Sequence, residues 1–279
     1  MNVTIRPEQL LYDSAVIPPA ESPRLHPWQK PLPHRLYKYY PPERFHILTD
    51  CAVRFSQREV FDDQHDLRPE VENFGTAEEI RAFMDYDPTL SPLTDALKNA
   101  VIQYVLHAPN VEQRLIEQAQ GQMAAPTEFG VFCLCENSRS RAMWDQYAAR
   151  GTGFLIAFNT RHPGFSFLRT PGLIGEVEYS AQKIPSFLTR YGATSFFQKR
   201  KRYSFESEWR SVRALRRFTN VHQPENGPAI YLSKFGPGCI AEIQILPECT
   251  VEMKLRTLVA VDCRYRHTRV NIYSRSSLR

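Results

Sequence analysis

The 279-residue chain has no run of about 18 or more consecutive apolar residues, so no segment is typical of a membrane-spanning helix. Its N-terminal stretch, MNVTIRPEQLLYDSAVIPPA, also lacks the apolar core of a secretory signal. With 42% hydrophobic and 23% charged residues, the composition is that of an ordinary soluble globular protein. We therefore expect a cytoplasmic protein with no membrane partner.

Cysteine is too sparse for a disulfide-stabilised scaffold, and nothing indicates export. Cys133 and Cys135 form C-x-C rather than the C-x-x-C of common zinc sites, and no histidine pair at ligand spacing completes four ligands. We expect reduced thiols and no bound metal. The cysteines are Cys51, Cys133, Cys135, Cys239, Cys249 and Cys263.

Several motifs of common enzyme classes are missing. The sequence contains no Walker loop, no G-x-G-x-x-G, no H-E-x-x-H and no G-x-S-x-G. These absences exclude phosphate-loop NTPases and α/β-hydrolases.

Prolines mark the clearest boundary. Seven of them lie in residues 1–33, where they block helix and central strand alike, which predicts an extended leader. Residues 34–279 mix helical and strand-like patterns without internal repeats, which predicts a single α+β domain. Within it, a helical insert is expected at about 76–123.

The insert carries three helical signals. Thr76 to Glu79 form a capping box, Ser91-Pro92 is a second helix start, and a third helix is expected at 111–123. An apolar stripe follows the second start until Pro109, and we assign it to the core. It consists of Leu93, Leu97, Val101 and Val105.

Outside the insert most segments are strand-like. A helix is expected at 138–150, ended by Gly151, and a basic helix or helix pair at 186–203. The expected strands are 35–40, 46–56, 129–136, 153–159, 173–180, 206–217, 229–233, 239–246 and 257–263.

Basic residues are concentrated in residues 190–217. The net charge of the chain is only +5, yet this segment holds nine basic residues against two acidic ones. Such a patch attracts polyanions or phosphate-bearing ligands, or it is simply a solvated surface. The basic residues are Arg190, Lys199, Arg200, Lys201, Arg202, Arg210, Arg213, Arg216 and Arg217.

The stretch ESEWRSVRA carries two glutamates separated by one residue. In a strand, Glu206, Glu208 and Arg210 share one face, with the carboxylates about 7 Å apart. Such a face is either exposed, where the glutamates form weak cross-strand ion pairs, or a site. Paired carboxylates suit reactions in which a sugar carbon becomes cationic.

Aromatic residues accompany two other candidate positions. Trp144 and Tyr147 are three apart on the expected helix, so they either enclose a flat ring or pack in the core. Lys38, within RLYKYY, is either a phosphate ligand or one exposed lysine among many.

Taken in order, these motifs resemble a bacterial family known only as a domain of unknown function. The motifs are LYKY, FCLCE followed by AMWDQYA and GTGFLIAF, FESEWR, and a late IYL, and the match spans roughly residues 34–235. That family in turn looks like the ADP-ribosyltransferase superfamily, whose active site is assembled from three strands in this order.

The resemblance implies an ADP-ribosyltransferase-like split β-sandwich that binds NAD as a substrate. Glu208 matches the position of the superfamily's catalytic glutamate, which stabilises an oxocarbenium-like transition state. Glu206 matches the first glutamate of the E-x-E motif, which steers the acceptor. Lysine replaces the usual arginine or histidine of the first strand, and cysteine the common serine of the second. The implied NAD-binding residues are Lys38, Tyr39, Cys135, Trp144, Tyr147 and Arg210.

The leading hypothesis is an NAD-dependent ADP-ribosyltransferase of a toxin or defence type. Its acceptor is a nucleic acid, a protein side chain or, by default, water. One alternative is a nucleic-acid-binding module, in which phosphates contact the basic run and bases stack on neighbouring aromatic rings. Another is a glycosidase-like or nucleoside-processing enzyme that uses both glutamates without NAD. The phosphate-binding set is Lys199, Arg200, Lys201 and Arg202, and the stacking set is Phe196, Phe197 and Tyr203.

Overall fold

The computed structural model describes residues 31–61, 66–67, 71–87, 90–123, 128–168, 173–180, 184–186, 188 and 196–278. The chain divides into two compact units, of which the larger comprises residues 25–61, 127–179 and 199–279. The smaller comprises residues 1–24, 62–126 and 180–198, so it holds the expected helical insert. The expected proline-rich leader lies outside the described residues, except for positions 31–33.

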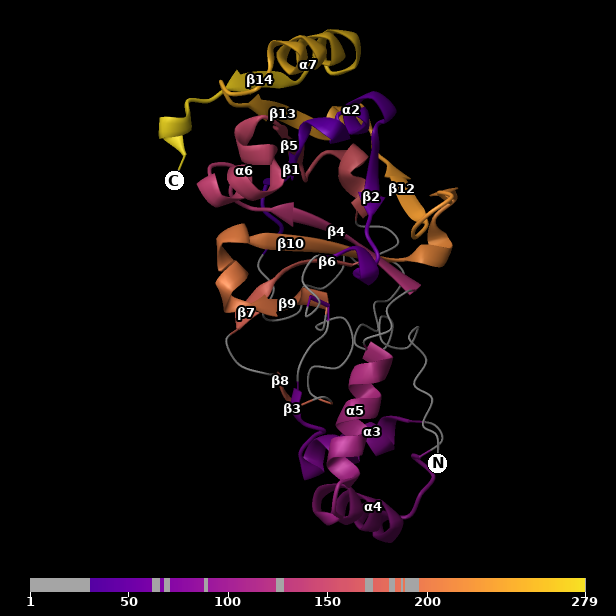
Figure 1. Ribbon diagram of the computed structural model, residues 1–279. Helices are drawn as coiled ribbons and strands as arrows, with labels where there is room; N and C mark the ends of the chain where they lie inside the picture. Colours follow the sequence, from indigo (N-terminus) through magenta and orange to yellow (C-terminus); the bar gives the residue numbers. More distant parts are fainter. Residues whose placement is uncertain are drawn as a thin grey trace. The chain divides into compact units, whose positions relative to one another are not determined.

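A seven-stranded sheet forms the centre of the larger unit (Figure 1). Its strand order is β14-β13-β5-β1-β4-β10-β6, and all neighbours are antiparallel except β13 and β14. The strands are β1 (Arg35–Tyr40), β4 (Phe129–Cys135), β5 (Phe154–Asn159), β6 (Leu173–Glu176), β10 (Glu208–Ala214), β13 (Ile240–Ile245) and β14 (Arg269–Ile272).

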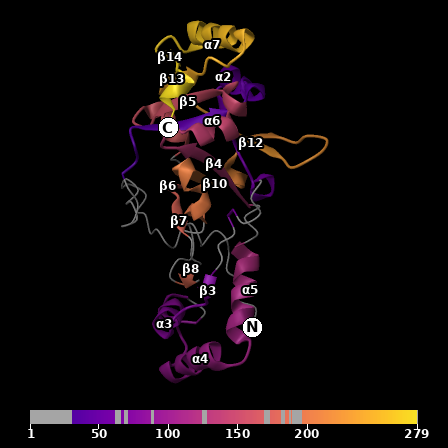
Figure 2. The same ribbon diagram turned by 60° about the vertical axis from the view of Figure 1, so that its left-hand side comes forward.

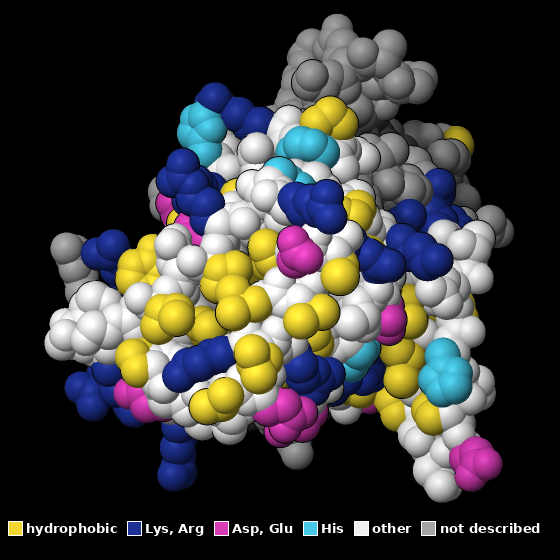
Figure 3. Space-filling view, turned by 90° about the horizontal axis from the view of Figure 1, so that it is seen from above, with side chains coloured by type: hydrophobic (Ala, Val, Ile, Leu, Met, Phe, Trp, Pro, Cys, Tyr) yellow, Lys and Arg dark blue, Asp and Glu magenta, His cyan; other side chains and the backbone are white. Residues whose placement is uncertain are grey.

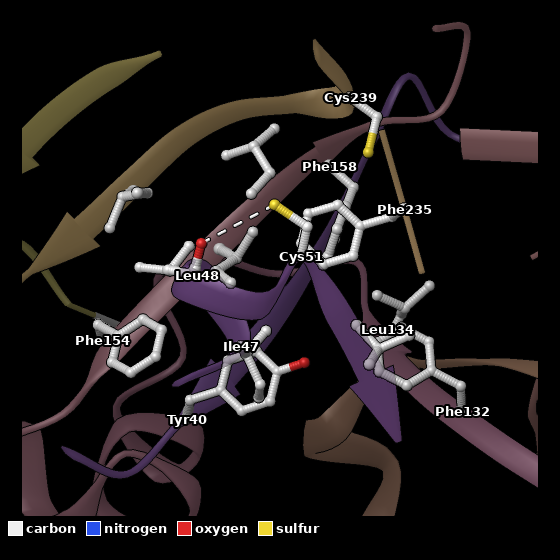
Figure 4. Packing of buried hydrophobic residues seen from close by; sticks show 14 of the residues in the cluster. Tyr40, Ile47, Leu48, Cys51, Phe132, Leu134, Phe154, Phe158, Phe235 and Cys239 are labelled. Atoms are coloured by element: carbon white, nitrogen blue, oxygen red, sulfur yellow. Dashed lines mark hydrogen bonds between the residues drawn. The ribbon is translucent and has the colours of Figure 1, made fainter. Parts of the chain in front are cut away.

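A three-stranded sheet packs against one face of this large sheet. It consists of β11 (Asn220–His222), β12 (Ile230–Lys234) and β2 (Ala52–Phe55), in that order. Phe55 of β2 lies 5.8 Å from Phe132 of β4, measured between ring centroids, and both belong to one buried cluster. Figure 4 shows Phe132, Phe158 and Phe235 within that cluster. The expected α+β class is confirmed.

Helix α6 (Arg141–Tyr147) lies within the helix expected at 138–150, and it covers the opposite face of the large sheet. Ser140 caps it, because the Ser140 side chain accepts a hydrogen bond from the backbone N–H of Met143. Met143 and Trp144 pack in a second buried cluster with Tyr39 of β1. A 3-10 turn, η4 (Ala149–Gly151), then leads into β5.

The prediction of one strand at 46–56 is wrong for its first half. Residues 46–50 form helix α2 (His46–Asp50), which buries Ile47 and Leu48, and β2 begins only at Ala52. Cys51 separates the two elements with φ of 50°, in the left-handed region. This turn changes the direction of the chain, so the β-prone segment 46–56 forms a helix followed by a strand.

The prediction of a strand at 257–263 is also wrong, because these residues lie within helix α7 (Val251–Arg264). Thr250 caps the helix by accepting from the Met253 N–H, and Met253, Thr257 and Val261 recur at helical spacing against the core. The apolar run alone does not distinguish the two structures. In both views α7 lies beside β13 and β14, whose parallel pairing requires such a crossover (Figures 1 and 2).

The prediction of a basic helix or helix pair at 186–203 is not confirmed by the described residues. Strand β8 (Ile184–Ser186) ends where the helix was expected to begin. Strand β9 (Gln198–Arg200) pairs with β7 (Glu178–Ser180), and a 3-10 helix, η7 (Lys201–Glu206), follows it. Residues 189–195 lie outside the described part of the chain. The Lys199 side chain is buried against Glu206 and Glu208, so the basic run does not form one solvated helical face.

The smaller unit contains the three expected helices, α3 (Ala77–Tyr86), α4 (Asp95–His107) and α5 (Val111–Met123), and the short strand β3 (Val71–Asn73), which pairs with β8. The capping box at Thr76 and Glu79 is confirmed. Helix α4 starts later than expected, since Thr94 rather than Ser91 is its N-cap.

The apolar stripe expected on α4 is only partly buried. Val105 is buried, but Leu97 and Val101 are 53% and 39% exposed. Ile102 contributes to the core in their place, beside Ile80 and Met84 of α3. The buried face of α4 is therefore rotated from the expected one.

No helix in the described ranges is both long and apolar enough to cross a membrane.

Gly153 is a specific requirement of the turn between α6 and β5. A Cβ atom there would overlap the backbone carbonyl oxygen of Tyr40 and would lie 3.0 Å from Pro41 Cα. We expect Gly153→Ala to lower the free energy of unfolding by about 3 kcal/mol, measured by urea denaturation. Gly227 is the control, because its φ is 103° but open space surrounds it. Gly227→Ala should cost only about 1 kcal/mol, and equal losses in the two variants would contradict this account.

Candidate functional site

Three neighbouring strands carry the sequence motifs. The register pairs Tyr37 of β1 with Cys135 of β4, and Cys135 with Glu208 of β10. Cys133 pairs with Arg210 in the same way. Directly paired residues share a face of the sheet, so these side chains belong to the face that α6 covers.

Lys38 lies on the opposite face of the sheet, which corrects its expected position. It pairs with Ile156, a residue of the core between the sheets, and its Nζ lies 5.4 Å from the centroid of the Phe132 ring. Because strand side chains alternate, a difference of one residue decides the face. Tyr37, rather than Lys38, occupies the β1 position in line with Glu208.

Glu206 reaches the site from outside the strand. It is the last residue of η7, and Ser207 follows with φ of 43° before β10 begins at Glu208. The expected alternation along one strand is therefore wrong at this position. The left-handed turn at Ser207 still brings both carboxylates to the same ammonium group.

Lys199 joins the two glutamates. Its Nζ donates to Glu206 Oε2 at 2.6 Å and to Glu208 Oε2 at 3.2 Å. The Lys199 side chain is 8% exposed, and its ammonium group lies 4.9 Å from the centroid of the Tyr203 ring. Lys199, which was expected to bind nucleic-acid phosphates, is instead buried and bound to two carboxylates.

Arg210 is the second cation of the site. It is fully buried and binds Glu208 with two hydrogen bonds, Nε to Oε1 at 2.9 Å and Nη2 to Oε2 at 3.0 Å. Such a bidentate pair fixes the plane of the carboxylate. Arg210, expected to bind NAD, acts first as the partner of Glu208.

Two phenols complete the cluster. Tyr147 of α6 donates its hydroxyl proton to Glu206 Oε1 at 2.7 Å. The backbone N–H of Glu208 donates to the hydroxyl oxygen of Tyr179 at 2.8 Å, which leaves the Tyr179 proton for another acceptor. The expected position of Tyr147 beside the glutamates is therefore found, and Tyr179 adds a second hydroxyl.

The environment displaces the pKa values of the two glutamates in opposite directions. Burial raises the pKa of Glu206, and the nearby Glu208 charge adds to this, although Lys199 counteracts it. Burial also disfavours the Glu208 charge, but Arg210 and Lys199 outweigh it and hold the pKa of Glu208 well below its usual range. Paired acids with divergent pKa values are typical of sites that divide acid–base roles.

The thiols on β4 are poor nucleophiles. Burial and the Glu208 charge raise the pKa of Cys133, which donates a hydrogen bond to Glu208. Burial raises the pKa of Cys135 to about 12, and its thiol donates to the backbone oxygen of Asn137 at 3.0 Å. Cys135 thus lies beside Glu208 as expected, but its hydrogen bond is directed at the backbone.

Trp144 and Tyr39 are structural residues. Trp144 is 1% exposed and donates its indole N–H to the Ser138 oxygen, and the Tyr39 hydroxyl donates to Asn137. Their rings meet edge to face, with centroids 5.3 Å apart. Both residues were expected to bind NAD, but both side chains are buried and pack in the core.

The rest of the basic run stays nearer to the surface. Lys201 and Arg202 are exposed and Arg200 is half-buried. The Arg202 guanidinium lies 4.7 Å from the centroid of the same Tyr203 ring that Lys199 contacts. Phe196 and Phe197 are buried, so the expectation that they stack on bases is wrong.

Within the described ranges, no group of three or more His, Cys, Asp or Glu residues is arranged to hold a metal ion. Comparisons with protein families, curated proteins and solved structures found no match to this chain.

Lys199 should control the proton affinity of the carboxylate pair. A raised pKa in the folded state, as at Glu206, costs stability as the pH rises from the ordinary glutamate value to the raised one. A lowered pKa, as at Glu208, contributes stability above the ordinary value, which is lost as the pH falls through the folded pKa.

We expect Lys199→Met to raise the pKa of Glu206 further and to weaken the depression at Glu208. Its stability deficit relative to the unsubstituted protein should grow between about pH 5 and pH 8, by at most about 1.4 kcal/mol per pH unit. Urea denaturation across this range measures the deficit. Lys201→Met removes the same charge from an exposed position and should show no such slope. A deficit that is independent of pH in Lys199→Met would contradict the prediction.

Proposed function

We propose that this protein is an NAD-dependent ADP-ribosyltransferase whose chemistry takes place at Glu208 and Glu206. One observation carries the proposal: a single ammonium group, that of Lys199, binds both carboxylates while their pKa values diverge. Strongly perturbed, interacting titratable groups are typical of catalytic sites. The expected split β-sandwich of the superfamily agrees with a large and a small sheet packed face to face.

Glu208 has the properties required to stabilise positive charge on a sugar carbon. Arg210 fixes its plane and its lowered pKa keeps it ionised. A preorganised charge in a poorly solvated site stabilises a developing opposite charge more strongly than water does. NAD supplies a ribosyl carbon that carries a good leaving group, and the Glu208 carboxylate would face the cationic character that develops there.

Glu206 suits the transfer of a proton from the acceptor. Its raised pKa makes it a stronger base when ionised, and Tyr147 holds one of its oxygens in place. The proton of the incoming hydroxyl or amine would pass to Glu206. A division between a charge stabiliser and a base thus follows from two environments within one cluster.

The surrounding residues fit a nicotinamide ribose, although this set of residues differs from the expected one. Tyr37 and Tyr147 are partly buried aromatic residues on the Glu208 face, where they would contact a flat ring in place of Trp144. The Tyr179 oxygen accepts a hydrogen bond from the Glu208 N–H, so its own O–H group would donate a hydrogen bond to a ribose oxygen. Lys38 is omitted, because it projects into the other face.

Exposed Lys201 and Arg202 next to this cluster favour an acceptor that carries negative charge, such as a nucleic acid. Nucleic-acid binding without catalysis is the weaker alternative. Two of its aromatic residues are buried, and one of its four cations is held between the glutamates.

Release of nicotinamide and transfer of label from NAD test the proposal. Glu208→Gln should lower the rate of nicotinamide release by at least about 100-fold, because it removes the negative charge at the reacting carbon. Glu225→Gln, an exposed carboxylate in a loop, is the matched control and should retain full activity.

Folding requires a separate control. Glu208→Gln leaves the buried Lys199 and Arg210 facing a neutral group, which is destabilising in itself. Glu208→Asp keeps the charge while withdrawing the carboxylate by one methylene, so it should fold and still release nicotinamide slowly. Normal release by a folded Glu208→Gln variant would refute the assigned role.

Glu206→Gln separates the two carboxylates. We expect it to abolish transfer of ADP-ribose to a macromolecular acceptor and to leave a larger share of NAD hydrolysis, since only the base for the acceptor is lost. Radiolabelled NAD and total nucleic acid or protein are the reagents. Equal losses of transfer and hydrolysis in Glu206→Gln would contradict this division of roles.

A further inference from the structure

Helix α7 has apolar residues on two opposite sides. One stripe packs against the main core, and the other begins two residues earlier with the same spacing. Two residues along an α-helix correspond to roughly 200° of rotation, so the stripes face opposite directions. The inner stripe is Met253, Thr257, Ala260 and Val261; the outer stripe is Val251, Leu255, Leu258 and Val259.

The outer stripe is exposed in this chain. Its four side chains are between 54% and 72% exposed. Figure 3, which views the molecule from above Figure 1 and therefore from the α7 side, shows hydrophobic side chains gathered on this face. A helix that is apolar on both sides is normally buried on both sides, and large exposed apolar patches mark interaction sites.

Strand β14 carries one more exposed apolar residue on the side of the sheet where α7 lies. Ile272 is paired with Ile245 of the core, so it projects from the sheet face that carries α7, yet it is 61% exposed. β14 is the last strand of the sheet, and among the described residues only its β13 side is paired. An unpaired strand edge beside an exposed apolar helix offers two kinds of contact to the same partner.

The size of the surface suits a second copy of the chain. Complete burial of one Val, Leu or Ile side chain removes on the order of 100 Å² of apolar surface, so the five exposed residues offer roughly 300 Å². One side of a standard interface buries about 800 Å² in total, somewhat over half of it apolar. The α7 stripe with Ile272 would thus supply a large part of the apolar centre, and the β14 edge would add polar contacts.

The spacing of the residues in the outer stripe also favours a second copy of the chain as the partner. In an antiparallel pair of identical helices centred on Leu255, Val251 lies opposite Val259 of the copy, and Leu255 lies opposite its own equivalent. A twofold axis requires such self-complementarity, because the same patch serves both subunits. We propose that the protein forms a twofold-symmetric homodimer through the outer face of α7 and the edge of β14.

Sedimentation velocity of the full chain over a range of concentrations tests the dimer. The unsubstituted protein should be dimeric at about 50 µM, and Leu255→Glu should raise the dissociation constant at least about 100-fold. Val221→Glu is the control, because Val221 is also exposed, at 45%, but lies on β11. Circular dichroism confirms that both variants fold, as is expected for exposed positions.

Crosslinking tests the antiparallel arrangement. Cys263, the exposed native cysteine, is first replaced by serine. Leu255→Cys in this background should then form a disulfide-linked dimer under mild oxidation, whereas Val221→Cys should not. A monomer at 50 µM, a dimer that Leu255→Glu leaves intact, or equal crosslinking of the two cysteine variants would each overturn the proposal.

Discussion

The shared ammonium group of Lys199 is the interaction on which the candidate site depends. Two carboxylates within reach of one another in a poorly solvated region repel, and burial adds a large cost to each charge. Lys199 offsets this repulsion at both glutamates, and Arg210 adds two hydrogen bonds to Glu208. The bidentate Arg210 pair adds to the shared ammonium group at Glu208, which explains why the two pKa values diverge although Glu206 and Glu208 are neighbours in the sequence.

The backbone determines the positions of these charged side chains. β10 lies between β4 and β6, which fixes Glu208 and Arg210 on the face covered by α6. The left-handed residue Ser207 then turns the chain so that Glu206 meets the same cation from η7. Buried ion clusters contribute little net stability, which agrees with the proposal that this one serves chemistry rather than folding.

Much of the fold was predictable because its signals are local. Alternation and apolar runs located β1, β4, β5 and β10, and the capping box located α3. α2 and α7 were missed, because short apolar runs suit either structure until their packing is known. The site residues Glu208 and Tyr147 were found from motifs, whereas Lys199 and Tyr179 were not. The contacts of these two depend on distant strands, and a basic run by itself indicates only a charged surface. Lys38 was misplaced by the one-residue alternation of a strand, which no motif encodes.

A crystal structure with a non-hydrolysable NAD analogue would test the central claim most directly. The account predicts that the nicotinamide ribose lies on the α6 side of the large sheet, with a ribose hydroxyl within hydrogen-bonding distance of Glu208 and the ring against Tyr37 or Tyr147. An analogue bound on the Lys38 face, or bound at a distance from both glutamates while Lys199 still joins them, would contradict it.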